Sequence, residues 1–295
     1  MTETAAGRAF REATLEYADA GTAEIAYRRF GERGTAPPLL FIHGWPLSGF
    51  TWRHCIAPLA KRRLCIVPDS PGAGDTKWKP EHEFRFRGQA EAYARFLDAL
   101  GLDRIDILAH DTGATIAREL ALIVGARVRR LVMINTEIPG HRPPWIQTFQ
   151  KLVHLPGATG SLRLMLRSRR FRRSGMGFGG CFVDMSKIEG EFHEGFVAPL
   201  IGSSRAMAGQ VRYLRGIDWE LVDGLAARHR EIAARVLMLW GTEDPTFPLE
   251  RGREMVPQLA RCDGLHEIPH AKLLVHEERP EAIVEHTTAY LDSGA

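Results

Sequence analysis

The sequence predicts an α/β fold: a mostly parallel sheet with helices on both faces and a helical segment inserted late in the chain. Short apolar runs alternate with helix-like stretches through the first 135 residues. The alternation breaks over residues 139–228, which are helical in character, and then resumes. Strands that alternate with helices pair in parallel, because each helix returns the chain to the same edge of the sheet. The break therefore divides the chain into core residues 1–138 and 229–295 around a helical lid, residues 139–228.

Each element of the first half has its own signal. Two strand-like runs on either side of Gly21 predict a hairpin over residues 14–31. Continuous apolar runs predict four buried strands, at residues 38–44, 64–69, 105–110 and 128–135. Apolar residues at helical spacing predict two helices, at residues 88–101, where Gly101 ends the helix, and 112–125.

The second half begins with the lid and ends with two further strands and helices. The lid contains the pair Pro143 and Pro144 and several glycines between residues 175 and 180. No strand precedes these glycines, so we interpret them as a flexible joint rather than a phosphate-binding loop. After the lid, the pattern predicts strands and helices in turn, at residues 236–241, 250–259, 265–268 and 280–291.

Composition and charge exclude several classes of protein. The 295 residues are 44% hydrophobic and 25% charged, and the net charge of +3 is too small to predict a nucleic-acid partner. No apolar run is long enough to span a membrane and the N-terminus lacks an apolar signal core, so we expect a cytoplasmic protein without a membrane partner. The four cysteines lack metal-site spacing. Six arginines gather between Arg163 and Arg173, which we interpret as a solvated helix face.

The segment that carries chemistry is a strand that turns sharply into a helix at Asp111. Such a turn projects one side chain above the sheet and requires small residues two positions before and after it, here Ala109 and Gly113. The pattern is that of a nucleophile elbow with aspartate in place of serine. The N-terminus of the following helix would favour the ionised carboxylate.

With this turn, the sequence resembles the α/β-hydrolase superfamily, in particular its epoxide hydrolase and haloalkane dehalogenase branch. Further landmarks in the expected order carry the same resemblance: HGWP at residues 43–46, DSPGAG at 69–74, WGTED at 240–244 and EERPE at 277–281. The resemblance covers nearly the whole chain. It implies the α/β-hydrolase fold with an inserted lid, and a pocket between lid and sheet that takes a small, partly apolar substrate.

The resemblance also implies a mechanism. The carboxylate of Asp111 attacks an sp³ carbon and forms an alkyl-enzyme ester, which water then hydrolyses. The backbone N–H groups of Trp45 and Thr112 would stabilise the oxyanion formed during hydrolysis. Asp244 matches the position of the acid that orients the catalytic histidine, and Glu137 is a reserve acid. No metal or organic cofactor is implied.

The sequence departs from the family where the catalytic histidine should stand. Counting from the last helix, that position holds Leu273. Either His270 or His276, three residues to each side, could act as a displaced base. Alternatively the reaction stalls at the ester, or the chain is an altered or ligand-binding member of the superfamily.

Signals for the substrate favour an epoxide over a haloalkane. Epoxide hydrolases of this branch use lid tyrosines, and Tyr213 lies in the predicted lid, whereas many dehalogenases carry tryptophan where this chain has Thr112. Further candidates for contact with the substrate are Trp145, His43 and Leu273. The sequence leaves the oligomeric state open.

Overall fold

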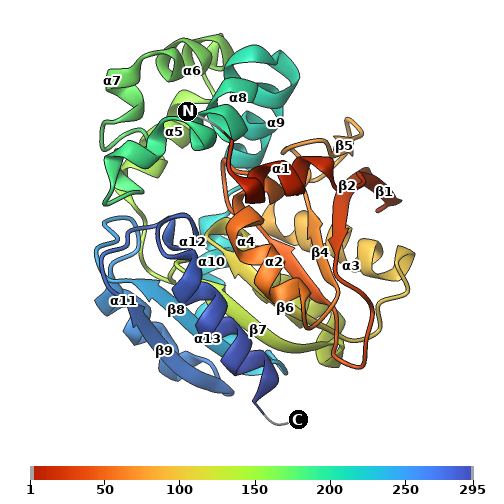
Figure 1. Cartoon of the computed structure of the whole chain (residues 1–295). Helices are drawn as coiled ribbons and strands as arrows, with labels where there is room; N and C mark the ends of the chain where they lie inside the picture. Colours follow the sequence, from red (N-terminus) through yellow and green to blue (C-terminus); the bar gives the residue numbers. More distant parts are fainter. Residues whose placement is uncertain (1–2, 294–295) are drawn as a thin grey trace.

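The computed structural model describes residues 3–293, and within them one sheet contains nine strands (Figure 1). The strands are β1 (Glu16–Asp19), β2 (Ala23–Phe30), β3 (Leu39–Ile42), β4 (Cys65–Pro68), β5 (Lys77–Trp78), β6 (Ile105–His110), β7 (Val128–Ile134), β8 (Arg235–Gly241) and β9 (Cys262–Ile268). Their order is β1-β2-β4-β3-β6-β7-β8-β9, with β5 paired to β2. Along this spatial order, every neighbouring pair between β4 and β9 is parallel. The pairs β1–β2, β2–β4 and β2–β5 are antiparallel. The predicted α/β fold class is confirmed.

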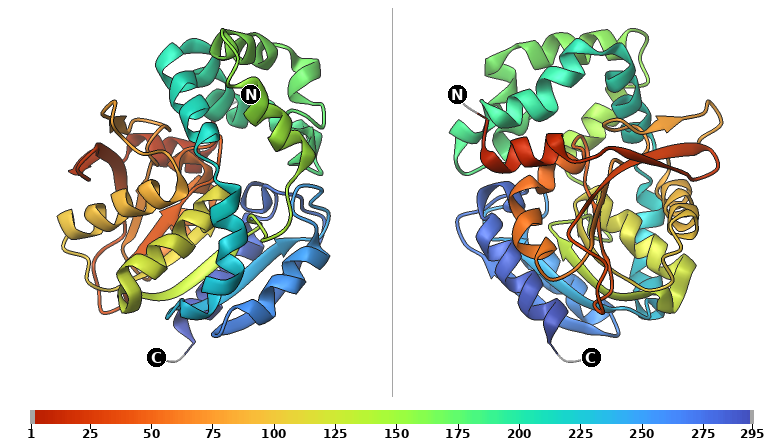
Figure 2. Two further views of the ribbon diagram at one scale, coloured as in Figure 1. Left: turned by 180° about the vertical axis from the view of Figure 1, so that it is seen from behind. Right: turned by 45° about the vertical axis from the view of Figure 1, so that its right-hand side comes forward.

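Helices cover both faces of this sheet. Those of the core are α1 (Ala5–Glu12), α2 (Arg53–Ala60), α3 (Phe86–Ala99), α4 (Thr112–Val124), α11 (Leu249–Met255), α12 (Val275–Glu278) and α13 (Pro280–Asp292). Helices α2 and α13 lie side by side on the face toward the viewer in Figure 1, and α3, α4 and α11 lie on the opposite face in Figure 2. Every residue of β3, β4 and β6 is buried, as expected for strands that are covered on both sides.

Between β7 and β8 the chain forms a second layer above the carboxyl ends of the strands (Figure 1). Its helices are α5 (Pro144–Leu152), α6 (Ala158–Arg167), α7 (Arg169–Arg172), α8 (Ala198–Gly202), α9 (Ser204–Arg215) and α10 (Trp219–Arg228). The last of them returns to the core, since Arg228 pairs with Glu119 of α4 at 2.6 Å (Figure 2). Among the described residues, no helix is both long and apolar enough to cross a membrane.

Helices α1 and α2 lie outside the elements that the sequence pattern predicted. Helix α2 contains Pro58, which breaks the helical pattern although the helix continues through it. Helix α1 is short, and its position depends on tertiary contacts: Phe10 packs against Phe30 and Phe50, at 5.7 and 5.4 Å between ring centroids. Contacts between distant segments therefore help to select both helices, and Thr4 caps the N-terminus of α1.

Candidate active site

Asp111 lies at the turn between β6 and α4 with a backbone conformation that is rare for a non-glycine residue, φ 53° and ψ −134°. The neighbouring glycines allow this close approach. A Cβ on Gly113 would lie 2.5 Å from the carbonyl oxygen of Ile42, and one on Gly44 would lie 2.5 Å from Cβ of Asp111. Neither distance is possible for a real side chain, so both positions require glycine. Strain of this kind concentrates at functional sites.

The carboxyl group of Asp111 meets the two residues that the resemblance implied as oxyanion donors. The backbone N–H of Trp45 donates to Oδ2 of Asp111 at 3.0 Å and to Oγ1 of Thr112 at 2.9 Å. The Tyr213 hydroxyl, from α9 of the lid, lies 3.1 Å from the same Thr112 oxygen. The structure therefore brings Asp111, Trp45, Thr112 and Tyr213 together.

Glu137 shares a cavity with Asp111, because the end of β7 lies beside the end of β6. Its Oε2 accepts hydrogen bonds from the hydroxyls of Thr115, at 2.6 Å, and Thr136, at 3.1 Å. Burial raises the pKa of both carboxyl groups, and Glu137 raises that of Asp111 further. The N–H groups of Thr112 and Trp45 oppose this rise for Asp111. A negative charge on Glu137 therefore disfavours ionisation of the buried Asp111 carboxyl group.

Asp244 is also buried, but its partner is an amide rather than a histidine. The Nδ2 of Asn135 donates to Oδ2 of Asp244 at 2.6 Å, and the N–H of Thr246 donates to Oδ1 at 2.8 Å. Burial nevertheless raises the pKa of Asp244 to about 7. Asn135 is held in turn, because its Oδ1 accepts from the N–H of Gly241 at 2.8 Å.

Leu273 lines the cavity beside Asp111. This cavity has a volume of about 20 Å³, enough for about one water molecule. No histidine lines it; within the described residues its lining consists of Trp45, Asp111, Thr112, Glu137, Trp145, Ile146, Ile217, Trp219, Thr246, Phe247 and Leu273. Two predicted contact residues, Trp145 and Leu273, therefore face the same space as Asp111.

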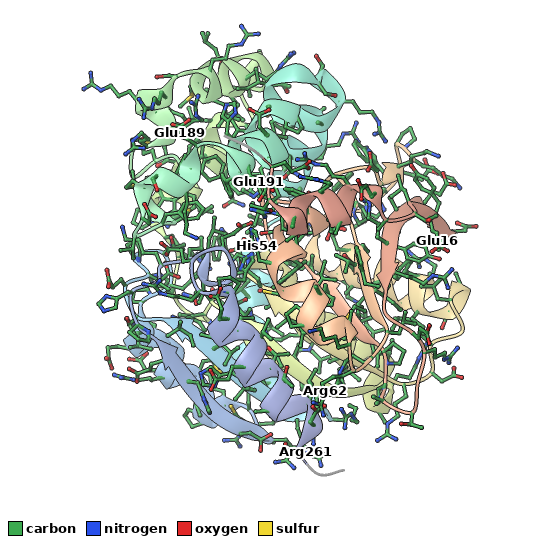
Figure 3. The ribbon with its side chains drawn as sticks, viewed as in Figure 1. Glu16, His54, Arg62, Glu189, Glu191 and Arg261 are labelled. Carbon is green, nitrogen blue, oxygen red and sulfur yellow. The ribbon has the colours of Figure 1, made fainter. Side chains whose placement is uncertain are left out.

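His276 belongs to a different, fully buried network. Its Nε2 lies 2.7 Å from the hydroxyl of Thr51, and its ring packs on those of Trp52 and His110, at 4.6 and 4.4 Å. The adjacent Glu277 carries the network on through Arg53 to Glu191, which is labelled in Figure 3. Burial lowers the pKa of His276 well below its ordinary value. His276 therefore lies between the core helices and does not line the Asp111 cavity.

The other two predicted histidines lie elsewhere. The side chain of His270 is 75% exposed and 3.3 Å from Glu243, so it faces solvent. His43 is buried with both ring nitrogens bonded, to the carbonyl of Gly44 and to the N–H of Ser70, each at 2.9 Å. These bonds hold two core loops together. Neither histidine is part of the cavity lining.

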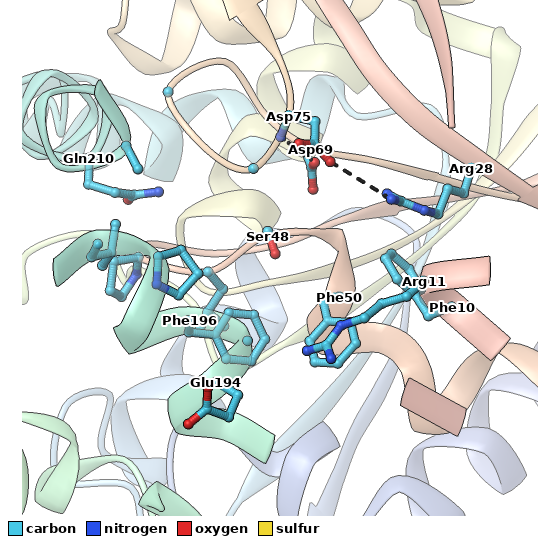
Figure 4. A pocket seen from close by; sticks show the side chains of 18 residues that line it. Phe10, Arg11, Arg28, Ser48, Phe50, Asp69, Asp75, Glu194, Phe196 and Gln210 are labelled. Carbon is cyan, nitrogen blue, oxygen red and sulfur yellow. Dashed lines mark hydrogen bonds and ion pairs between the residues drawn. The ribbon is translucent and has the colours of Figure 1, made fainter. Parts of the chain in front are cut away.

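Two larger cavities lie near the Asp111 cavity. An apolar cavity of about 80 Å³ under the lid shares Trp45, Trp145 and Leu273 with it. An outer cavity of about 420 Å³ shares Pro46, Leu200 and Gln210 with the apolar one. Its wall mixes apolar and charged side chains, with Arg28 turned toward Asp75 and with Arg11 beside Phe50 (Figure 4). The shared residues place the apolar cavity between the outer cavity and that of Asp111.

Several residues of the site were not predicted from the sequence. Thr115, Thr136 and Arg118 surround Glu137, and the carbonyl of Glu137 accepts from Arg118 at 2.8 Å. Phe247 and Ile217 complete the cavity wall. Thr115 and Arg118 lie on α4, whereas Thr136, Ile217 and Phe247 come from other segments. Because the set forms no single local motif, no pattern in the sequence could identify it.

The sequence is similar to those of several known proteins. Residues 37–161 match the model of the alpha/beta hydrolase fold family. The chain is 27% identical over 266 residues to haloalkane dehalogenase 2 of Mycobacterium tuberculosis, covering 85% of this chain and 87% of that protein. It is 36% identical over 107 residues to the soluble epoxide hydrolase of Corynebacterium sp.. That match covers 36% of this chain and 37% of that protein. It is 24% identical over 280 residues to the cis-3-alkyl-4-alkyloxetan-2-one decarboxylase of Shewanella oneidensis. This match covers 88% of this chain and 83% of that protein.

Solved structures show the same architecture. The epoxide hydrolase CorEH superposes with a TM-score of 0.75 at 21% identity, over 95% of this chain and 98% of that chain. The haloalkane dehalogenase DbeA from Bradyrhizobium elkani superposes with a TM-score of 0.76 at 22% identity, over the same shares. The α/β-hydrolase fold is thereby confirmed, as is the resemblance to epoxide hydrolases and haloalkane dehalogenases.

Proposed function

We propose that this chain, having the α/β-hydrolase fold, is a cofactor-free hydrolase of epoxide hydrolase or haloalkane dehalogenase type with Asp111 as its nucleophile. One observation carries the proposal: the Asp111 carboxyl group stands at a strained strand-to-helix turn and accepts a hydrogen bond from the N–H of Trp45. A carboxylate held in this way is oriented for in-line attack on an sp³ carbon.

In the first step an oxygen of Asp111 forms a bond to the substrate carbon. The carbon–oxygen bond of an epoxide, or the carbon–halogen bond of a haloalkane, breaks, and the electron pair leaves with the oxygen or the halide. An epoxide oxygen then requires a proton; Tyr213 does not line the cavity, but its hydroxyl lies 3.1 Å from Oγ1 of Thr112, which does, and we assign it as the donor. This proton donor favours an epoxide over a haloalkane.

In the second step water must attack the ester carbonyl, and here the chain differs from an ordinary hydrolase. Leu273 supplies no base, and His270 and His276 lie outside the cavity. Glu137 is the ionisable side chain that shares the cavity with Asp111. We therefore propose that the ester forms readily and that its hydrolysis, with Glu137 taking the proton from water, is slow.

Intact-protein mass spectrometry tests this proposal. The protein is mixed with a panel of epoxides and haloalkanes, and product release is followed in the same samples. We expect an adduct with the mass of the opened epoxide that outlasts the supply of substrate, and no adduct on the Asp111→Ala variant. Fast product release without a lasting adduct would show that another base completes the reaction. If neither an adduct nor a product forms with any member of the panel, the assignment of Asp111 as nucleophile is refuted.

A second candidate follows from the apolar side chain of Leu273. A four-membered lactone can be opened by Asp111 at the ring carbon that bears the oxygen, which forms an alkyl ester and frees a carboxylate. Loss of carbon dioxide from that carboxylate then forms the carbon–carbon double bond and breaks the ester bond, so Asp111 is regenerated without water. This route needs no histidine, and the Shewanella oneidensis relative is named for such a decarboxylation. Release of an olefin and carbon dioxide from a cis-dialkyl β-lactone would favour it over the hydrolase.

A further inference from the structure

The outer end of the lid has an unusual distribution of charge. From Ile138 to Val183 the chain contains eight basic residues and no acidic one. Within this segment, α6 and α7 form the part of the lid farthest from the sheet in Figures 1 and 2. A surface made from this stretch therefore attracts anions.

Some of the basic side chains are used inside the lid, and others are not. Arg169 and Arg172 pair with Glu189, which is labelled on the lid in Figure 3, at 3.2 and 3.3 Å. In contrast, the exposed side chains of Arg167 and Arg170 form no ion pair or hydrogen bond with any residue between 3 and 293. Their charges remain available to a partner.

The same segment also exposes large apolar side chains. Of the six large hydrophobic residues that are exposed in the described chain, five lie here: Leu152, Leu155, Leu164, Met176 and Val183. Leu164 is 67% exposed and Leu155 is 57% exposed. Apolar side chains concentrated in this way on a surface mark an interaction site.

We propose that this surface, which we call the lid surface (Leu152, Leu155, Leu164, Met176, Arg167 and Arg170), docks on an anionic lipid bilayer. Exposed leucines in the same segment as unpaired arginines are typical of helices that lie in the interface of a membrane, with the apolar side chains inserted and the basic ones at the headgroups. The docking is peripheral and does not depend on the proposed function. It departs from the expectation, drawn from the sequence, that the protein has no membrane partner.

A cavity beside the lid surface favours lipid over an acidic protein as the partner. Met176 is exposed and also lines the apolar cavity, together with Leu162, Leu166 and Phe171 from the same helices. This cavity shares Trp45, Trp145 and Leu273 with the one that contains Asp111. An apolar molecule that leaves the bilayer here would therefore enter an apolar cavity next to that of Asp111.

Vesicle co-sedimentation of the whole protein tests the proposal. We expect binding to vesicles of mixed phosphatidylglycerol and phosphatidylcholine and much weaker binding to phosphatidylcholine alone. Each basic residue at an anionic surface strengthens binding about fivefold, so the Arg167→Gln/Arg170→Gln variant should bind about 25-fold more weakly. The Leu155→Ser/Leu164→Ser variant should also bind more weakly, because it loses the inserted side chains.

Control variants carry comparable changes elsewhere on the surface. Arg33→Gln/Arg230→Gln removes two exposed charges at the amino-terminal edge of the sheet, opposite the lid, and Tyr17→Ser removes the exposed apolar side chain on β1. These controls should bind as the unchanged protein does. Absence of binding to anionic vesicles would overturn the proposal, as would equal losses in the lid and control variants. Binding to an acidic polymer such as heparin but not to vesicles would also overturn it and indicate a polyanionic macromolecule.

Discussion

Substituting histidine for Leu273 should convert a slow enzyme into a faster one. Leu273 is 5% exposed and lines the same cavity as Asp111. Its backbone is fixed, because its carbonyl accepts from Nε2 of His110 at 2.9 Å. An imidazole at this position would share the cavity with the ester that Asp111 forms, as a general base for water requires.

The size of the gain depends on what can orient the new imidazole. A well-placed general base contributes about 10²–10⁴-fold. Asp244, the acid at the family position, already accepts hydrogen bonds from Asn135 and Thr246, so it is partly committed. We therefore expect the lower end, a gain of about 100-fold in ester hydrolysis. Placing a polar ring in this buried position should lower the free energy of unfolding by about 1–3 kcal/mol.

A single-turnover assay separates the two steps. The amplitude and rate of adduct formation are followed by mass spectrometry, and release of the diol is followed by chromatography. In Leu273→His, adduct formation should be unchanged while release becomes faster. Leu273→Gln is the matched control, since it is polar and of similar size but has no basic nitrogen. Adding Asp244→Ala to Leu273→His should remove most of the gain.

One result would refute this reasoning. If Leu273→His and Leu273→Gln both form the adduct and release product equally slowly, the absent base does not limit turnover. Similar melting temperatures for the two variants would exclude loss of the folded state as the cause.

Three further predictions concern other groups. Tyr213→Phe should slow adduct formation with epoxides about 10²–10³-fold and leave it unchanged with haloalkanes, since a halide needs no proton; equal losses would contradict the role of the phenol. Adduct formation should increase with pH well above the ordinary carboxyl range, because burial and Glu137 raise the pKa of Asp111 and the carboxylate is the reactive form. Glu137→Gln should shift this pH profile to lower values, and an unshifted profile would argue against the coupling. Burial lowers the pKa of His229 to about 3, so the unfolded chain binds the proton first and stability decreases as pH falls below about 6.5. His229→Gln should reduce this slope by about 1.4 kcal/mol per pH unit in urea denaturation, and an unchanged slope would contradict it.

Much of the core could be predicted because its signals are local. A strand covered on both sides must be apolar throughout, so runs such as β3 and β6 are visible in the sequence. The turn at Asp111 was visible for a related reason, because its close backbone contacts require small residues at fixed spacing. Helix α2 was not predicted, since packing against α13 rather than its own pattern keeps it helical.

The positions of the candidate site residues divide in the same way. The sequence by itself determined that Leu273 stands at the expected position of the base, and that Asp111, Trp45 and Thr112 occupy the turn and the loop beside it. Residues within one motif keep their relative places because the backbone between them is short. The sequence could not decide between His270 and His276, or give the orientation of Tyr213.

Only the tertiary structure gave the positions of these side chains. It places His276 against Thr51, which comes from the other end of the chain, and it leaves His270 in solvent. It also brings Glu137 into the Asp111 cavity and Tyr213 from the lid to Thr112. The physical reason is that burial and hydrogen bonding select among rotamers and loop paths through contacts between distant segments, and those contacts exist only once the sheet and the lid have assembled.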